Sequence, residues 1–360
     1  MLENTLYKLT QDKKLTVGYF GGSITEGAGS SDPEKTSWRA LNTAWLREQF
    51  PEAEITPIQA AIGGTGSDLG AYRIDRDLLA HEPNLVFVEF AVNDNGMSYN
   101  HVAEHYETVL RKIYTANPCA DVICLFTITR AIYEYIRRGQ EYISRAAQSA
   151  IAHAYGVSAI LDVGAALADR TVAEGGDWSR YTTDTVHPND EGYVIYADLI
   201  NGWMAEALLD KQAPATLTPK ALPASVCPCA PFGAKLIPAQ NVLPAEGWQA
   251  VDKSLCRRYP TYIESCGEEK PFLFRFTGSE IGLYMMFAHD TGYFYYRIDG
   301  REWVKGVAYD KYCAQFDRAC YHILAKHMPV REHTLEIYAA KEAPEGSEGN
   351  ATRIGAFMVG

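Results

Sequence analysis

The sequence predicts an α/β domain, in which a parallel sheet lies between two layers of helices, followed by a smaller all-β sandwich. Over the first 210 residues, short apolar runs alternate with helical patterns, which is typical of a parallel sheet covered on both faces. A proline-rich stretch then ends the helical periodicity. Beyond residue 225 the apolar segments are aromatic and β-branched, as in the strands of an antiparallel sandwich.

Five strands and six helices are expected in the α/β part. The run Leu85-Val86-Phe87-Val88 is apolar throughout, as in a strand buried on both faces. The expected strands are Leu15–Phe20, Ile55–Ala61, Leu85–Ala91, Asp121–Ile128 and Val157–Asp162. The expected helices are Pro33–Phe50, Ser67–Ala80, His101–Asn117, Gln140–Tyr155, Val163–Ala168 and Asp190–Leu209.

The domain boundaries follow from a change in composition and in hydrophobic periodicity along the chain. We expect a first domain over residues 1–210, a Pro/Ala-rich linker over 211–224 and a β-sandwich over 225–360. Closely spaced prolines cannot continue a helix and make a semi-rigid linker. Asp299-Gly300 between two aromatic segments is a strong hairpin signal. Carbohydrate binding is one function that the second domain could have.

Composition excludes several classes of partner. The net charge of −12 over 360 residues argues against nucleic acid and against an anionic membrane surface. The apolar runs are too short to cross a bilayer, and the polar start of the chain does not resemble a signal peptide. None of the eight cysteines forms a C-x-x-C pair, so we expect reduced thiols and a cytoplasmic protein.

One stretch stands where an open α/β sheet places its ligands. Gly21-Gly22-Ser23-Ile24-Thr25 follows the first expected strand, and parallel strands carry ligand sites at their carboxyl ends. The glycines allow the backbone to approach closely, which makes Ser23 a candidate nucleophile. The structural alternative is a βα connection in which Ser23 only caps the next helix.

Three further stretches can converge on Ser23. Ile62-Gly63-Gly64-Thr65 and Ala91-Val92-Asn93-Asp94 follow the second and third strands. Asp184-Thr185-Val186-His187-Pro188 precedes the last helix of the domain. Because the carboxyl ends of parallel strands meet at one edge of the sheet, these segments can lie close together.

Convergence would supply the groups of an acyl-transfer site. His187 is the expected general base, since its unperturbed pKa lies near neutrality, and Asp184 would fix its tautomer. The expected oxyanion donors are the amides of Ser23 and Gly64 and the side-chain amide of Asn93. Each stretch alone also fits ordinary turn or capping chemistry. Their joint occurrence at these junctions favours catalysis.

Two other kinds of site are disfavoured. Gly64 to Gly70 opens a helix after a strand, with Glu89 about twenty residues on, as in a dinucleotide-binding turn. However, the glycine spacing is one residue too long, and the turn belongs to the second βα unit. His101 and His105 are one helical turn apart, but no Cys/His cluster completes a metal site. We therefore expect neither a cofactor nor a metal.

Together the four stretches resemble the sequence blocks of the SGNH (GDSL-like) hydrolase superfamily, over roughly residues 14–210. The resemblance implies a three-layer, flavodoxin-like α/β fold. In that family the residues matching Ser23, Gly64, Asn93 and His187 are the nucleophile, two oxyanion donors and the base. Gly22 replaces the usual Asp, and a second departure puts alanine in place of the usual glycine at position 91. Neither removes a reacting group.

The Gly22 form resembles the carbohydrate-esterase branch of the superfamily. A catalytic domain joined to a C-terminal, jelly-roll-like sandwich also looks like two-domain bacterial carbohydrate O-acetyl esterases, including those acting on acetylated mannan or xylan fragments. This resemblance implies a serine esterase that removes O-acetyl groups from carbohydrate through an acetyl-enzyme. Four aromatic residues on expected loops at the rim of the site could stack on a sugar ring. They are Tyr133, Tyr135, Trp178 and Tyr181.

Two alternatives stay open at this point. The same Ser-His-Asp site could serve a lipase, lysophospholipase or thioesterase, although no amphipathic apolar lid adjoins the four stretches. The chain could also be a non-catalytic carbohydrate-binding protein, although every reacting residue is present. The sequence leaves open the sugar, the acetyl position and the oligomeric state, a homo-oligomer included. It also leaves open whether the second domain contributes to the active site.

Overall fold

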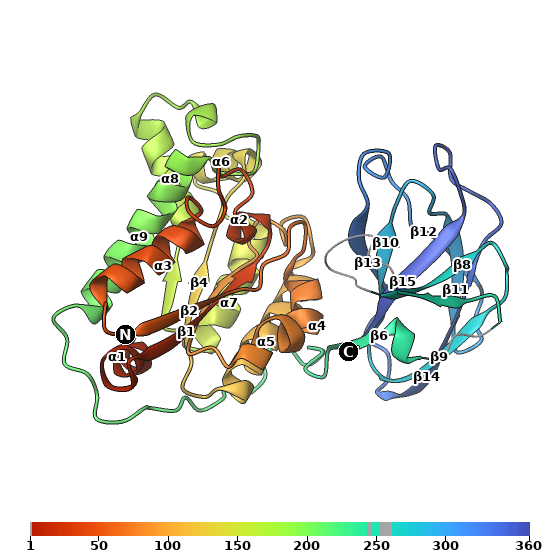
Figure 1. Ribbon diagram of the computed structural model, residues 1–360, viewed down its shortest axis with the longest axis horizontal. Helices are drawn as coiled ribbons and strands as arrows, with labels where there is room; N and C mark the ends of the chain where they lie inside the picture. Colours follow the sequence, from red (N-terminus) through yellow and green to blue (C-terminus); the bar gives the residue numbers. More distant parts are fainter. Residues whose placement is uncertain (1, 243–245, 253–260) are drawn as a thin grey trace. The chain divides into compact units, whose positions relative to one another are not determined.

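The computed structural model describes residues 2–242, 246–252 and 261–360 (Figure 1). Contacts within the chain divide it into two compact units, Met1–Phe232 and Gly233–Gly360. The positions of the two units relative to each other are not determined.

The first unit contains the expected parallel sheet. All five predicted strands are present, and they pair in the order β2-β1-β3-β4-β5, which is the order of flavodoxin-like sheets. The strands are β1 (Lys14–Gly21), β2 (Glu54–Gln59), β3 (Leu85–Glu89), β4 (Asp121–Leu125) and β5 (Ala159–Leu161). The order reverses beside β1, so the crevice beyond the ends of β1 and β3 is where such folds bind ligands.

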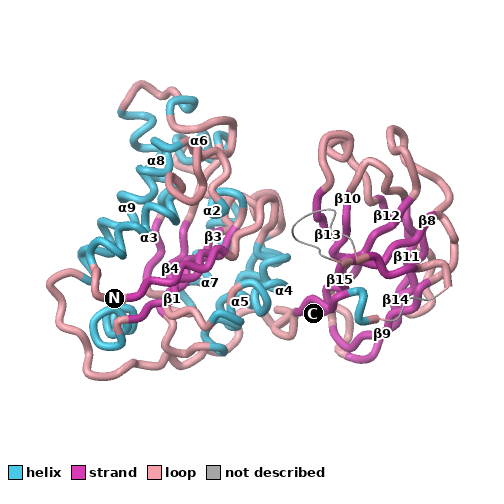
Figure 2. The backbone as a smooth tube through the Cα atoms, in the orientation of Figure 1, coloured by secondary structure: helices cyan, strands magenta, loops and turns pink. Residues whose placement is uncertain are grey.

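Helices cover both faces of this sheet (Figure 2). One layer is α3 (Trp38–Gln49), α8 (Val163–Ala173) and α9 (Asp190–Leu208), and the other is α4 (Ser67–Asp77), α5 (Tyr99–Ala116) and α7 (Ile143–Ala154). Side chains alternate between the faces along a strand. Tyr19 of β1 thus packs edge-on against Trp38 of α3, with ring centroids 5.4 Å apart. Its neighbour Phe20 packs against Phe90 on the other face.

Several helices differ from expectation. The helix expected from Pro33 begins at Trp38, because Ser37 caps it by accepting a hydrogen bond from the amide of Ala40. Three short helices were not expected: α1 (Glu3–Tyr7), α2 (Ser23–Glu26) and α6 (Arg130–Arg137). A π-helical turn, Lys8–Asp12, follows α1. Each of these elements is shorter than the window over which a helical pattern becomes clear.

The proline-rich segment lies along the first unit. The amide of Lys220 donates to the carbonyl of Pro118 at 2.8 Å. The amides of Val226 and Cys227 donate to the carboxylate of Glu107 on α5 at 2.8 and 2.6 Å. The residues expected to form a linker, 211–224, therefore belong to the first unit, and the division falls after Phe232.

The second unit consists of two antiparallel sheets. Its core includes Phe272, Phe274 and Phe357, with the rings of Phe274 and Phe357 stacked 4.0 Å apart. The first sheet contains β6 (Lys235–Pro238), β7 (Gln249–Val251), β8 (Tyr262–Cys266), β10 (Ile281–Phe287), β13 (Arg318–Ala325) and β15 (Ala351–Val359). The second contains β9 (Phe272–Gly278), β11 (Tyr293–Ile298), β12 (Val304–Val307) and β14 (Arg331–Ala339).

The predicted hairpin at Asp299-Gly300 is present between β11 and β12, which pair antiparallel. Both residues have positive φ, 53° and 68°, as a type I′ turn requires.

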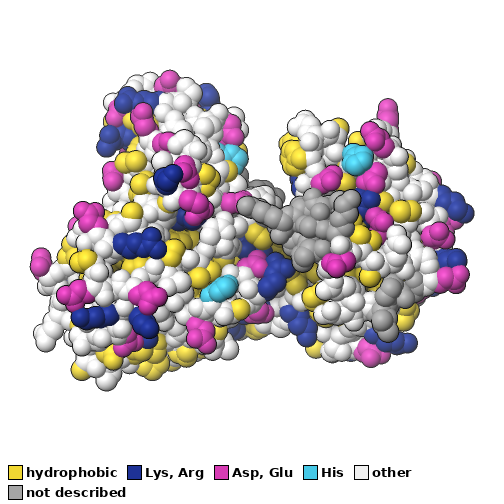
Figure 3. Space-filling model, in the orientation of Figure 1, with side chains coloured by type: hydrophobic (Ala, Val, Ile, Leu, Met, Phe, Trp, Pro, Cys, Tyr) yellow, Lys and Arg dark blue, Asp and Glu magenta, His cyan; other side chains and the backbone are white. Residues whose placement is uncertain are grey.

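Figure 3 shows one face of the molecule. On this face, acidic and basic side chains are interspersed. Among the helices of the described ranges, none is long and apolar enough to cross a membrane.

Candidate active site

Ser23 lies where β1 passes into α2, at the carboxyl edge of the sheet. The sharp turn is held by Gly22, whose amide donates to the carbonyl of Glu89 at the end of β3. The residue that caps α2 is Gly22 and not Ser23, which is the first residue of the helix. The serine hydroxyl is therefore available for another partner.

That partner is His187. The Nε2 atom of His187 lies 2.9 Å from Oγ of Ser23, although the two residues are 164 positions apart. On the other side of the ring, Nδ1 lies 2.8 Å from Oδ2 of Asp184. The structure thus brings together the three residues that the sequence nominated as nucleophile, base and orienting acid.

Asp184 is held in its ionised form by the turn that connects it to His187. Its Oδ1 accepts the amides of Val186 and His187 at 2.6 and 2.7 Å. Partial burial raises the pKa of Asp184, but the bonds from the His187 side chain and from the two amides outweigh it and lower the pKa overall. A carboxylate at this position fixes the imidazole tautomer, leaving Nε2 free to accept a proton.

The expected oxyanion donors are the amide of Ser23 itself, the amide of Gly64 and the side chain of Asn93, and the segments that carry the last two lie close to Ser23. A Cβ placed on Gly22 would lie 2.1 Å from Oδ1 of Asn93, so the Asn93 side chain lies directly against the peptide before the serine. A Cβ on Gly63 would lie 3.4 Å from Cβ of Ser23, which puts the Gly63-Gly64 turn next to the serine. Gly64 has φ of +73° and is exposed. Among the described residues, none accepts a hydrogen bond from the amides of Ser23 or Gly64 or from the Asn93 side chain.

Two buried carboxyl groups support this edge of the sheet. Asp94, next to Asn93, accepts the amide of Ser67 at 2.8 Å and the side chain of Gln148 at 2.7 Å. It thereby joins the turn after β3 to the turn after β2. Burial, and secondarily the nearby Asp68, raise the pKa of Asp94 to about 7.

The second buried carboxyl group is Glu89, the candidate ribose-binding acid of the disfavoured dinucleotide site. It accepts the hydroxyls of Thr25 and Thr127 at 2.8 and 2.6 Å and is 1% exposed. Burial raises its pKa, against the effect of these hydrogen bonds. Glu89 is buried beneath the turn that carries Ser23, where a ribose could not reach it.

The four aromatic candidates for sugar stacking are placed differently from one another. Tyr133, Trp178 and Tyr181 are 2%, 4% and 4% exposed and belong to the hydrophobic core, whereas Tyr135 is 47% exposed. Tyr133 and Tyr135 lie on α6, where we expected a loop. A buried ring has no face to offer a sugar, so only Tyr135 remains a candidate for stacking.

Sequence reasoning missed the residues that hold the site together. Trp178 donates its indole N–H to the carbonyl of Asp184 at 3.2 Å. Glu26, one helical turn after Ser23, accepts the amide of Gly63 at 2.8 Å. Asp94 directly follows the expected donor Asn93. Only Glu26 could have been singled out from the sequence, because the spacing of Ser23-x-x-Glu26 resembles a helix capping box.

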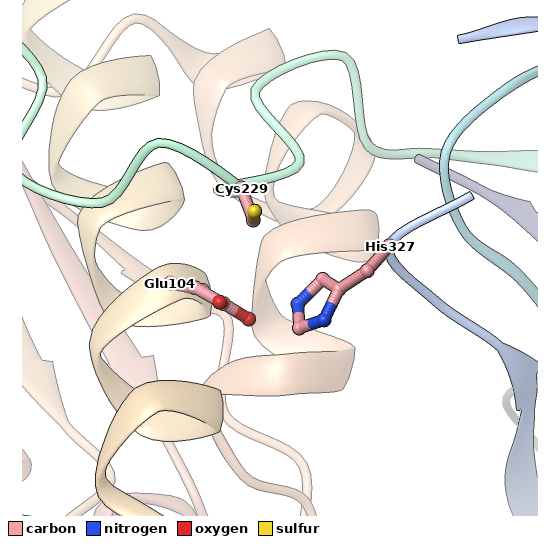
Figure 4. Close-up of side chains that lie close together, drawn as sticks. All are labelled: Glu104, Cys229 and His327. Atoms are coloured by element: carbon pink, nitrogen blue, oxygen red, sulfur yellow. The ribbon is translucent and has the colours of Figure 1, made fainter. Parts of the chain in front are cut away.

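One pair of potential metal ligands lies on α5 and on the segment after α9. Glu104 and Cys229 both belong to the first unit, and their ligand atoms lie within 4.8 Å of one another (Figure 4). His327, drawn with them, belongs to the second unit, whose position relative to the first is not determined. Two ligands do not make a zinc site, and we infer no metal centre from them.

Comparison with known proteins identifies the family. Residues 19–195, from β1 into α9, match the model of the GDSL-like Lipase/Acylhydrolase family. This range includes Ser23, Asn93 and His187. No curated protein matches the chain significantly in sequence.

Two solved structures resemble the chain over its full length. One is a two-domain esterase active on acetylated mannans, with 22% identity, a TM-score of 0.82, and coverage of 100% of this chain and 95% of that chain. The other is that esterase co-crystallised with mannopentaose, with 22% identity, a TM-score of 0.82, and coverage of 99% and 94%. At this identity the likeness shows a shared two-domain fold. With the family match, it follows that the protein is a carboxylic ester hydrolase whose α/β unit belongs to the GDSL-like lipase/acylhydrolase family.

Proposed function

We propose that the protein removes O-acetyl groups from carbohydrate by forming an acetyl-enzyme on Ser23. The observation that carries the mechanism is the continuous hydrogen-bonded line from Ser23 Oγ through His187 to Asp184, at 2.9 and 2.8 Å. A neutral hydroxyl needs such a base to become a nucleophile.

The reaction would proceed in two halves. Oγ of Ser23 attacks the acetyl carbonyl carbon while Nε2 of His187 takes the hydroxyl proton. The amides of Ser23 and Gly64 and the Asn93 side chain donate to the oxyanion that forms. Collapse of this intermediate breaks the bond to the sugar oxygen, which takes the proton from His187. Water, deprotonated by His187, then attacks the carbonyl carbon of the acetyl-serine. Collapse of this second intermediate breaks the bond to Oγ of Ser23, which takes the proton back from His187, and acetate is released.

The substrate class rests on two observations. The first is the likeness of fold to an esterase active on acetylated mannans. The second concerns the amphipathic helix α6. The amide of Arg130, its first residue, donates to the carbonyl of Thr185, which follows Asp184 in the chain. The apolar residues Ile132 and Tyr133 of the helix are buried, while Tyr135 and Arg137 are exposed. A helix that buries its apolar side in the core does not make the apolar lid that a lipase or lysophospholipase would use.

The mechanism is tested by Ser23→Ala and His187→Ala, assayed with 4-nitrophenyl acetate. Each should lower kcat by several orders of magnitude, about 10⁶ where a triad has been dissected fully. Ser149→Ala, on α7, which contributes no group to the site, is the matched control and should keep wild-type kcat. Substantial turnover by Ser23→Ala would exclude the acetyl-serine.

The substrate is tested by acetate release from acetylated manno- and xylo-oligosaccharides, followed by NMR to identify the position attacked. Comparison of 4-nitrophenyl acetate with the octanoate ester separates this proposal from the lipase and thioesterase alternatives. A higher kcat/KM for octanoate, with no acetate released from the oligosaccharides, would favour a longer-chain acylhydrolase. A chain that binds the oligosaccharides without turning over any ester would be a carbohydrate-binding protein.

A further inference from the structure

Glu26 connects the nucleophile helix to the glycine turn. It lies on α2, three residues after Ser23, and its Oε2 accepts the backbone amide of Gly63 at 2.8 Å. We propose that Glu26 is a positioning residue that holds the Gly63-Gly64 turn against Ser23 and so sets the place of the Gly64 amide. This inference rests on the proposed function, in which that amide donates to the oxyanion.

Within the turn, the hydroxyl of Thr65 donates to the carbonyl of Ile62 at 2.7 Å, which closes the turn on itself but does not connect its tip to Ser23. Gly64 is exposed, has φ of +73°, and would have no atom within 4 Å of an added Cβ. Hydrogen bonds hold the two ends of the turn: the Ile62 amide donates to Gly21, and the Ser67 amide donates to Asp94. Between these ends, the bond to Glu26 acts on the residue directly before Gly64.

The local helix does not explain the position of Glu26. In a capping box the glutamate reaches back to the amide of the capping residue. Here the capping residue is Gly22, and its amide donates instead to the carbonyl of Glu89. The carboxylate of Glu26 therefore reaches across to another βα turn. Because Ser23 and Glu26 lie on the same helical turn, the distance between the nucleophile and the residue that holds the glycine turn stays fixed.

Gly63 is suited to this contact. An added Cβ would lie 2.9 Å from Oε2 of Glu26 and 3.4 Å from Cβ of Ser23. The absence of a side chain lets the carboxylate and the serine approach the same peptide from two sides. A hydrogen bond from an amide to a carboxylate is stronger than one between neutral groups, which suits a tip that must stay in place during the reaction.

The test compares two variants of similar length. Glu26→Met keeps an unbranched side chain but cannot accept a hydrogen bond, whereas Glu26→Gln keeps a carbonyl oxygen that can accept the Gly63 amide. With 4-nitrophenyl acetate, Glu26→Met should lower kcat about 10- to 100-fold with little change in KM, less than the about 10²–10³ lost with a whole oxyanion donor. Glu26→Gln should stay within about 3-fold of wild type. Asp32→Ala, which removes a carboxylate accepting the Glu34 amide at 3.1 Å, is the control and should leave kcat unchanged.

A second variant keeps the inference testable if Glu26→Met does not fold. Gly63→Ala forces the carboxylate away and should lower kcat to a similar extent. If both variants fold, the double variant should be little worse than either single one, since both break the same contact. Inactivation by diethyl 4-nitrophenyl phosphate, whose phosphoryl oxygen would occupy the oxyanion position, should slow in parallel with kcat.

The outcomes separate this inference from the proposed function. If Ser23→Ala abolishes turnover but Glu26→Met or Gly63→Ala keeps wild-type kcat, the positioning role is wrong and the mechanism stands. If Glu26→Gln is as impaired as Glu26→Met, the charge matters rather than the hydrogen bond, and the inference is overturned. If Ser23→Ala retains turnover, the proposed function itself fails.

Discussion

Trp178 donates its indole N–H to the backbone carbonyl of Asp184 at 3.2 Å. The ring is 4% exposed and packs against Tyr133, with centroids 5.4 Å apart. A buried aromatic pair therefore lies beneath the turn that carries the acid. This contact gives Trp178 a role in holding Asp184, in place of the sugar contact suggested by the sequence.

Trp178→Phe should impair catalysis moderately while the fold persists. Phenylalanine keeps a ring in the core but removes the donor to the Asp184 carbonyl, and a hydrogen bond of this kind contributes about 0.5–1.5 kcal/mol. We expect kcat to fall about 3- to 10-fold, because a looser turn orients His187 less well. The measurement is kcat with 4-nitrophenyl acetate alongside a melting curve. Trp203→Phe, the same exchange on α9, is the control; equal kcat in both variants would show that the contact does not influence the triad.

Asn93→Ala should lower kcat about 10²–10³-fold with little change in KM, since the lost donor acts chiefly on the developing oxyanion. Asn95→Ala removes an exposed amide from the same turn and should leave kcat near wild type. Steady-state kinetics of the two variants with one aryl acetate give the comparison. A large rise in KM at constant kcat for Asn93→Ala would instead assign Asn93 to ground-state binding.

The sequence was most informative where local pattern and topology agree. The apolar runs placed all five strands of the sheet, and the carboxyl ends of parallel strands share one edge. That rule explains why the stretches of Ser23, Gly64 and Asn93 were expected together. His187 precedes helix α9 instead of following a strand, and it was expected beside Ser23, 164 residues away, because a serine nucleophile needs a base and because the four stretches resemble the SGNH blocks. No knowledge of side-chain packing was needed for this step.

Contacts between distant side chains could not be predicted in the same way. An aromatic residue in a polar segment can cover the core or face a ligand, and Trp178 and Tyr133 turned out to be buried. The roles of Glu26 and Asp94 depend on which amides the fold brings to them, Gly63 and Ser67. Periodicity carries no information on such pairs.

Gly22→Ala should disturb the Asn93 donor through a direct clash. The added methyl group would lie 2.1 Å from Oδ1 of Asn93, so the amide has to move away from the serine. We expect kcat to fall about 10- to 100-fold, approaching the loss of a whole donor. Gly202→Ala on α9 is the control, because no atom lies within 4 Å of its added Cβ and alanine favours a helix by about 1 kcal/mol. Unchanged kcat in Gly22→Ala would mean that Asn93 can adjust without losing its function.

Asp94 should make the stability of the first unit depend on pH. Burial raises the pKa of Asp94 to about 7, whereas an unfolded aspartate titrates near 3.9. Between these values the folded chain binds more protons than the unfolded chain, so stability falls as pH rises from about 4 to about 7 and then levels off. The largest effect of this one group would be about 4 kcal/mol.

Asp94→Asn should remove that dependence without breaking the contacts. The oxygen of the introduced amide can still accept the Ser67 amide. Its NH₂ group can donate to Oε1 of Gln148 once the Gln148 amide turns, and this oxygen has no partner now among the described residues. Urea unfolding between pH 4 and 9 measures the effect. The variant should match wild type near pH 4 and exceed it in stability above pH 7.

The control for this pH dependence is Asp169→Asn, at an exposed position on α8. Removal of one exposed side-chain charge, away from the core, should change stability little at any pH. A difference between Asp94→Asn and wild type that stays constant from pH 4 to 9 would show that Asp94 does not titrate as its burial implies.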